Sequence, residues 1–469
     1  MPRKPKALLS RPLFSEPVFN EGVPTPDPSQ FQVTPNDQQF YTNEVQKLLS
    51  TEAVAFPQAR GNPGDLFELA SAWGPHGQDV INSINAAKCI TFQMIGDSGA
   101  TATKTFGAMI KVADAVTNDF HTSSAANRPS FLYHLGDLVY NFGEANYYYD
   151  QFYEPYRDYP APIFAIPGNH DSFILPNTPS AQDPLTTFIR QFCNPQIVVT
   201  PEAGSLHRTS ITQPGVYFTL DAPYVRIIGL FSNALEDPGV ISSESATSAT
   251  AKAKGGKAKG KSGKGKPTGS ARWPAVPDYQ LAFLTAQLQN IKSSNYNGAV
   301  ILAMHHPPFT YSPGTSNAGG GKHGGSPNML AQIDAICQQV GVYPHAVISG
   351  HAHNYQRFTR ALKFAGNNYS VPFIICGDSG HNVTPLVSSN FGKTPPEPND
   401  NVNVSYLDKS SVFAGTGLTL NRHDQKNSGY LRVSVTATQL TMTFNPVNTT
   451  GAPAKPDTVT VNLKSHSSA

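Results

Sequence analysis

Cysteine and long apolar runs are scarce in this chain. Its 469 residues include only four cysteines, at Cys89, Cys193, Cys337 and Cys376. A chain of this length can fold without disulfide bonds, and three of these residues lie inside or beside apolar runs, so we expect buried free thiols. No run of eighteen apolar residues occurs, which argues against a membrane-spanning helix.

The N-terminal sequence also lacks the apolar core of a secretory leader. MPRKPKALLSRPLF carries basic residues but only the short apolar stretch ALL before the next arginine. A leader needs a much longer apolar stretch than this. We therefore expect a soluble, cytoplasmic protein.

Positive charge is nearly balanced by negative charge outside one segment. The net charge is +2, but seven lysines lie between residues 252 and 266, and without them it would be −5. No general basic surface for nucleic acid is therefore indicated. Residues 241–272 are rich in Lys, Gly and Ser and cannot bury a core, so we expect a disordered surface insertion. If the insertion has a function, the alternative interpretation is weak binding to a polyanion.

The rest of the chain reads as one large domain. Hydrophobic residues make up 39% of the sequence, which is ordinary for a folded protein. Residues 1–35 are rich in proline and polar residues, and we expect a disordered tail there. Residues 36–464 are expected to form a single domain, because the candidate ligands between Asp97 and His353 must meet in one place.

Five apolar runs end in oxygen- or nitrogen-bearing side chains, as buried strands with a site at one edge would. The runs and their terminal residues are ITFQMIGDSG with Asp97, FLYHLGDLVY with Asp137, PIFAIPGNHD with Asn169 and His170, AVILAMHHPP with His305, and HAVISGHAHN with His351 and His353. Helical patterns, such as the one over Thr101 to Val116, separate several of them. In such α/β sheets, sites form outside the carboxyl ends of the strands.

The residue types at these strand ends suit a two-metal centre. Two ions held close together need hard anionic oxygens, one of them bridging, and imidazoles that complete each shell. Each motif alone is weak, because a Gly-Asp pair is usually a turn and a buried histidine is usually a core residue. Five such motifs in one order are much harder to assign to chance.

The blocks GDSG, GDLVY, GNHD, AMHHP and GHAH, in this order, resemble the five motif blocks of the purple acid phosphatases within the calcineurin-like metallophosphoesterases. The wider family usually has a histidine two residues after the first aspartate. Here Gly99 occupies that position and Tyr140 appears in the second block. The resemblance implies an α/β (α+β) fold, a four-layer αββα metallophosphoesterase sandwich of two mixed β-sheets flanked by helices.

The resemblance also implies a role for each motif residue. Asp97, Tyr140 and His353 would bind one metal, expected to be Fe(III). Asn169, His305 and His351 would bind a second ion, expected to be Fe(II), Zn or Mn, and Asp137 would bridge the two. His170 would face the phosphate as a catalytic residue. His306 and His323 are candidate substrate contacts. The alternative for His306 is a packing role, and the alternative for His323 is a place in an ordinary mobile loop.

The implied reaction is hydrolysis of small phosphate monoesters by attack of a metal-bound hydroxide, as in an acid phosphatase. A phosphodiesterase or nucleotide hydrolase on the same metal site is the alternative. A catalytically silent binding protein, tethered to polyanions by its lysine-rich segment, is a second one. Members of the resembled family are often secreted, which conflicts with the missing leader.

Two further residues look like site residues but are expected to lie outside the ligand set. Asp378 belongs to a second GDSG block, identical to the first, and is expected to form a tight turn near the site at most. His134 alternates with apolar neighbours inside its strand, which favours a core position or an outer contact.

Overall fold

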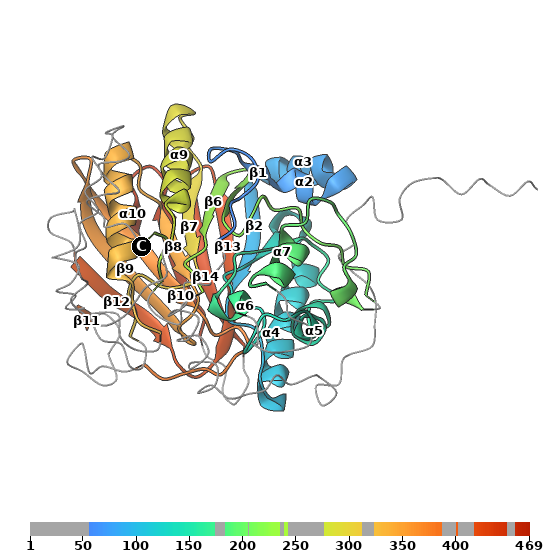
Figure 1. Cartoon of the computed structure of the whole chain (residues 1–469). Helices are drawn as coiled ribbons and strands as arrows, with labels where there is room; N and C mark the ends of the chain where they lie inside the picture. Colours follow the sequence, from blue (N-terminus) through green and yellow to red (C-terminus); the bar gives the residue numbers. More distant parts are fainter. Residues whose placement is uncertain are drawn as a thin grey trace, which may run out of the picture.

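Two mixed β-sheets face each other, with helices on both outer sides (Figure 1). In the described residues, the nine-stranded sheet has the order β1-β5-β6-β7-β8-β10-β9-β12-β11, and the seven-stranded sheet the order β16-β15-β14-β13-β2-β3-β4. Aromatic rings from both sheets meet between them, for example Tyr133 stacked on Phe218 with 6.1 Å between ring centroids. This αββα sandwich confirms the predicted fold class.

The computed structural model describes residues 56–173, 183–204, 206–234, 239–242, 276–311, 323–386, 400–401, 417–447 and 455–469. Two predicted features lie wholly or almost wholly outside these ranges: the disordered tail at 1–35 and the lysine-rich insertion at 241–272. The domain boundaries stay predictions.

The strands before the predicted site residues are parallel and adjacent within each sheet. In the seven-stranded sheet they are β2 (Cys89–Ile95), β3 (Pro129–His134) and β4 (Ile163–Ala165). In the nine-stranded sheet they are β7 (Ala299–Met304) and β8 (Ala346–Ser349); β10 (Asn367–Cys376), which precedes the second GDSG block, pairs parallel to β8. Nearly every residue of β2, β3 and β7 is buried, which explains why these strands read as continuous apolar runs.

The remaining strands extend the two sheets, mostly by antiparallel pairing. β5 (Phe218–Ala222) and β6 (Val225–Leu230) form one antiparallel pair, and β13 (Ser428–Thr436) and β14 (Gln439–Val447) form another. The others are β1 (Phe67–Glu68), β9 (Tyr355–Phe364), β11 (Asp400–Asn401), β12 (Gly417–Asp424), β15 (Asp457–Asn462) and β16 (Ser467–Ser468).

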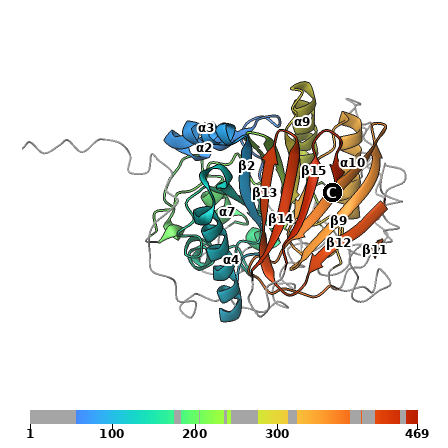
Figure 2. The ribbon, with the colours of Figure 1, turned by 180° about the vertical axis from the view of Figure 1, so that it is seen from behind.

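Helices cover the outer faces, and Figure 2 shows α4 beside the strands β13 to β15. α3 (Gly77–Ala87) contacts β2, α4 (Thr103–Thr122) contacts β13 and β14, and α9 (Tyr279–Ser293) contacts β6. The helix α10 (Pro327–Val340) packs on α9. Shorter helical segments are α2 (Leu69–Ala72), η2 (Gly74–His76), η3 (Ala125–Asn127), α5 (Ala145–Tyr148), η4 (Tyr149–Tyr153), α6 (Asn169–Ser172), α7 (Thr186–Phe192) and η5 (Pro201–Ala203).

The prediction of buried free thiols is confirmed for three of the four cysteines. Three of the four cysteines are buried and Cys89 is half-buried, all in the free form.

Within the described ranges, no helix combines the length and apolarity needed to cross a membrane.

A buried ion pair joins α10 to the nine-stranded sheet. The Arg360 guanidinium on β9 donates to both carboxylate oxygens of Asp334, at 2.9 and 2.7 Å, and to the Tyr343 hydroxyl at 2.7 Å. Both charged side chains have 0% exposure. Removing one partner of such a pair leaves an uncompensated buried charge.

We therefore expect Asp334→Leu to lower the free energy of unfolding by about 3–5 kcal/mol, measured by chemical denaturation. The control is Arg422→Ala, because the Arg422 side chain is 60% exposed and lies 3.8 Å from Asp457. It should change stability by less than about 1 kcal/mol. Equal losses in the two variants would contradict this account.

Candidate functional site

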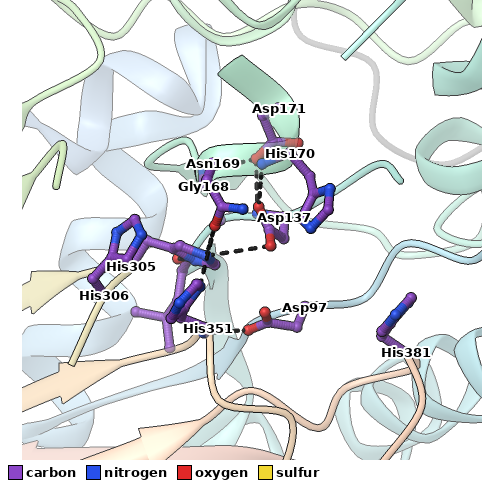
Figure 3. A network of polar contacts seen from close by, with 12 residues as sticks. Asp97, Asp137, Gly168, Asn169, His170, Asp171, His305, His306, His351 and His381 are labelled. Carbon is purple, nitrogen blue, oxygen red and sulfur yellow. Dashed lines mark hydrogen bonds and ion pairs between the residues drawn. The ribbon is translucent and has the colours of Figure 1, made fainter. Parts of the chain in front are cut away.

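The predicted site residues meet where the carboxyl ends of the five strands that precede them converge. Residues after β2, β3 and β4 come from one sheet, and residues after β7 and β8 come from the other. Figure 3 shows Asp97 and Asp137 between the histidines at 305, 306 and 351 on one side and His381 on the other. Every predicted ligand is buried, with at most 7% exposure.

Three donor atoms form a first group, which we call the tyrosine group. The Tyr140 hydroxyl lies 3.1 Å from Asp97 Oδ1 and 3.1 Å from His353 Nε2. His353 Nε2 lies 3.5 Å from the same Asp97 oxygen. These are the three residues that the motif resemblance assigned to one ion.

A second group, the asparagine group, lies on the other side of Asp137. Asn169 Oδ1 lies 3.1 Å from His305 Nε2 and 3.1 Å from His351 Nδ1. His305 Nδ1 is 2.9 Å from the carbonyl oxygen of Leu135, which can only accept, so this nitrogen carries the hydrogen. In the neutral ring, the Nε2 lone pair of His305 therefore faces the group.

Asp137 joins the two groups through one oxygen atom. Its Oδ2 lies 2.9 Å from the Tyr140 hydroxyl and 3.3 Å from His305 Nε2. Its Oδ1 accepts the backbone N–H of His170 at 2.9 Å, which fixes the orientation of the carboxylate. A carboxylate that is shared in this way is suited to bridge two cations.

Three of these residues have left-handed backbone conformations. The φ angles of Asp97, Asp137 and His351 are 56°, 57° and 67°. Such angles are uncommon outside glycine, and they persist where the surroundings impose them, often at functional sites. One local restraint is the His351 N–H, which donates to Asp97 Oδ2 at 2.8 Å.

The electrostatics of the site favour a bound cation. Burial, with Asp137 nearby, raises the pKa of Asp97 to about 8, although His305 opposes this shift. Burial alone would raise the pKa of Asp137 as well, but His305 and His170 hold it below its ordinary range. Burial would lower the pKa of His305, yet the Asp137 and Asp97 carboxylates raise it to about 9. Two buried carboxylates thus compete for one imidazole, a shortage of positive charge that a metal ion would relieve.

The donor set fits metal ions in kind as well as in charge. Ligand atoms of Asp137, His305 and His351 lie within 4.8 Å of one another. Carboxylate, amide and phenol oxygens with imidazole nitrogens are the ligands of hard and borderline cations. Seven residues in two groups with a shared carboxylate could therefore hold two ions.

The other predicted residues lie around these groups. The His170 and Tyr140 ring centroids are 4.2 Å apart. The His306 ring lies 4.2 Å from that of His351, and its Nδ1 is 2.8 Å from the Ser232 hydroxyl. The His323 ring is 4.5 Å from that of His353. His134 stays inside β3, with its Nε2 2.8 Å from Ser98 Oγ, as expected for a core histidine.

Asp171 was not singled out from the sequence, although it belongs to the GNHD block. Its carboxylate accepts the backbone N–H groups of Asp137 at 2.7 Å, Leu138 at 2.9 Å, Val139 at 3.2 Å and Gly168 at 2.8 Å. The side chain has 0% exposure. It therefore holds the loop that carries Asp137 and Tyr140.

The second GDSG block, which was expected to form a turn near the site at most, lies directly against the first. The Ser379 N–H donates to the Gly96 carbonyl at 3.1 Å, and the Gly96 N–H reaches the Ser379 hydroxyl at 3.3 Å. The next residue of this segment, Gly380, leads into His381, whose ring stacks on Tyr140. Sequence reasoning missed His381, and the repeated tetrapeptide was the only signal for it.

Comparison with known proteins gives one family match. Residues 94–241 match the family model described as calcineurin-like phosphoesterase. No curated protein matches the chain at a significant level.

The solved structures that the chain matches are remote in sequence. A structure of GAP50, the anchor in the inner membrane complex of Plasmodium, is 10% identical with a TM-score of 0.41, over 79% of this chain and 88% of that chain. A structure of PhoD is 11% identical with a TM-score of 0.42, over 80% of this chain and 70% of that chain. At such low identities and TM-scores the likeness says nothing about activity.

We expect Asp171→Asn to loosen the loop of residues 137–140, because its amide nitrogen would face backbone donors. The free energy of unfolding should fall by about 3 kcal/mol, within the range for buried hydrogen bonds to a charged group. Titration with Zn²⁺ in a calorimeter should show at least tenfold weaker binding. A variant with wild-type stability and affinity would show that the loop holds itself in place.

Proposed function

We propose that this protein is a binuclear-metal phosphatase that hydrolyses phosphate monoesters. The premise is that residues 94–241 belong to the calcineurin-like phosphoesterase family. The observation that carries the proposal is the single Asp137 oxygen that lies within 3.3 Å of both donor groups. An arrangement with one buried carboxylate between two sets of ligands is what a two-metal phosphoesterase requires.

The proposed ligands follow the two groups. Asp97, Tyr140 and His353 would hold one ion, Asn169, His305 and His351 would hold the other, and Asp137 would bridge them. When bound, two such cations would neutralise the charge of a phosphate ester and make a bound water more acidic. The hydrogen bonds that Asp137 accepts from the His170 N–H and that His305 donates to the Leu135 carbonyl oxygen would keep these two donors aimed at the ions without reorganisation.

His170 is the proposed proton donor to the leaving group. Its Nδ1 lies 2.8 Å from the carbonyl oxygen of Asn141, so this nitrogen carries a hydrogen and holds the ring in one orientation. The proton on Nε2 of the imidazolium would pass to the departing alkoxide oxygen, leaving neutral His170 and an alcohol. A positioned acid of this kind contributes roughly two to four orders of magnitude in rate.

The occurrence of Gly99 together with Tyr140 supports assignment of the protein to the purple acid phosphatase branch of the family. A Cβ atom at Gly99 would lie 2.7 Å from Cδ2 of Tyr140 and 2.7 Å from the carbonyl oxygen of Leu138. No real side chain tolerates such contacts, so the tyrosine ring and a residue larger than glycine exclude each other here. In this proposal the tyrosine would supply the donor that a histidine supplies in the wider family.

Tyr140 also favours a trivalent ion. Burial, followed by the Asp137 and Asp97 carboxylates, raises the pKa of its hydroxyl well above the ordinary value. Deprotonating this group takes a strongly charged partner, and phenolate is a hard anionic donor. Fe(III) in the tyrosine group, with Fe(II), Zn or Mn in the asparagine group, meets both conditions.

The first test of the proposed function is Asp137→Ala. Because the bridging oxygen is lost, we expect the variant to lose both ions in elemental analysis and to hydrolyse an aryl phosphate monoester at the background rate. Asp114→Ala, on α4, is the control and should keep both properties. If the Asp137 variant still bound two ions per chain, the ligand assignment would be wrong. A wild-type protein that cleaves only diesters would favour the phosphodiesterase alternative, and one that cleaves no ester the silent binding protein.

The second test is His170→Ala. We expect the variant to retain two ions per chain while kcat falls by roughly two to four orders of magnitude, because the acid is lost and the ligands are not. An ester with a very acidic leaving group, which needs no protonation, should lose less. Loss of a metal ion instead would make His170 a ligand.

The third test concerns colour. Phenolate bound to Fe(III) absorbs visible light by charge transfer, so the oxidised iron-loaded protein is expected to be pink to purple. Tyr140→Phe should remove this band and leave the circular dichroism spectrum unchanged. An unchanged visible band in the Phe variant would place the protein outside the purple branch.

A further inference from the structure

His381 lies against the aromatic ring of Tyr140. Their ring centroids are 3.9 Å apart and the ring planes differ by only 11°, which is a parallel stack. A second imidazole, that of His170, also contacts the Tyr140 ring but is tilted by 39°. His381 is therefore the ring most closely parallel to the phenol among the described residues at this site.

Backbone atoms of the first GDSG block hold His381 in place. Its backbone N–H donates to the carbonyl oxygen of Asp97 at 3.0 Å. Its Nδ1 lies 3.0 Å from the carbonyl oxygen of Gly99, and because a carbonyl only accepts, Nδ1 carries the hydrogen. The imidazole cannot rotate without breaking this bond. Its orientation is thus set by the same four residues that contain the Asp97 ligand.

The stack bears on the chemistry because the position of the Tyr140 hydroxyl is closely constrained by its neighbours. It lies between 2.9 and 3.1 Å from Asp137 Oδ2, Asp97 Oδ1 and His353 Nε2. A tilt of the phenol ring would move its hydroxyl away from at least one of the three. In a close-packed interior, such a tilt is prevented by the atoms that contact the faces of the ring.

We infer that His381 is a positioning residue that holds the Tyr140 phenol in the plane required by the tyrosine group and keeps water from that ring face. It acts through Tyr140 and is not itself a ligand. The inference deepens the proposed function, and only its colour and rate readouts rest on that function. The structural readout, in metal-free protein, does not.

Two substitutions distinguish the effect of the aromatic ring of His381 from the effects of its volume and its hydrogen bond. His381→Leu fills similar space without an aromatic ring, and His381→Phe keeps a ring without the Nδ1–H group. The matched control is His466→Leu, because His466 also stacks on a tyrosine, Tyr369, with ring centroids 4.2 Å apart and planes 6° apart. It lies at the other end of β8, where it stacks on His345, the residue just before that strand.

The first measurement is ¹⁹F NMR of metal-free protein labelled with 3-fluorotyrosine. The chain has 19 tyrosines, and the Tyr140 resonance is identified by its loss in Tyr140→Phe. We expect His381→Leu to shift and broaden this resonance, His381→Phe to keep it narrow, and His466→Leu to leave it unchanged. An unchanged Tyr140 resonance in the Leu variant would overturn the inference. If the Leu variant does not fold, the Phe variant decides, since a broadened line there would equally contradict a role for stacking.

The second measurement uses iron-loaded protein. His381→Leu should shift the visible band and lower kcat on the order of tenfold with little change in KM, as misplacement of a positioned group does, and His381→Phe should restore most of both. A wild-type band and kcat in the Leu variant would count against the inference. A colourless wild type would instead mean that the proposed iron site is wrong, while the ¹⁹F result would still test the stack.

Discussion

The arrangement at this end of the molecule depends on one buried carboxylate. Asp137 is 1% exposed and shares a single oxygen between two groups of donors. Burying such a charge is costly unless it is paired and hydrogen-bonded. The neighbouring backbone is held in place by a second buried carboxylate. The Asp171 carboxylate accepts the N–H groups of Asp137, Leu138 and Val139 and thereby holds the chain in a left-handed turn.

Neither sheet can build the two groups alone. Asp97, Tyr140 and Asn169 follow strands of the seven-stranded sheet, whereas the histidines at 305, 351 and 353 follow strands of the nine-stranded sheet. Each donor group contains residues from both sheets, so the site exists only when the sandwich is closed. The contact between the two GDSG blocks fixes this junction, because it joins Gly96 after β2 to Ser379 after β10.

The histidines show how far environment decides function. His345 and His351 lie at opposite ends of β8. His345 accepts the Val300 N–H at 2.9 Å and lies 3.0 Å from the Leu463 carbonyl oxygen, so the backbone occupies both of its nitrogens. His351 Nδ1 instead faces Asn169 Oδ1 in the donor group. A residue type alone does not distinguish these two uses.

Local patterns in the sequence predicted the buried strands, the helices between them and the polar residues at the strand ends, because apolar runs and the polar residues that end them are local features. The resemblance of the motif blocks to a known family implied that Asp137 would lie between the two groups. Only the tertiary structure decided that its Oδ2 faces both groups, that Asp171 holds its loop and that His381 stacks on Tyr140. These contacts join residues up to 241 positions apart in the chain, as for Tyr140 and His381. They follow from how two sheets close on each other, which no local pattern encodes.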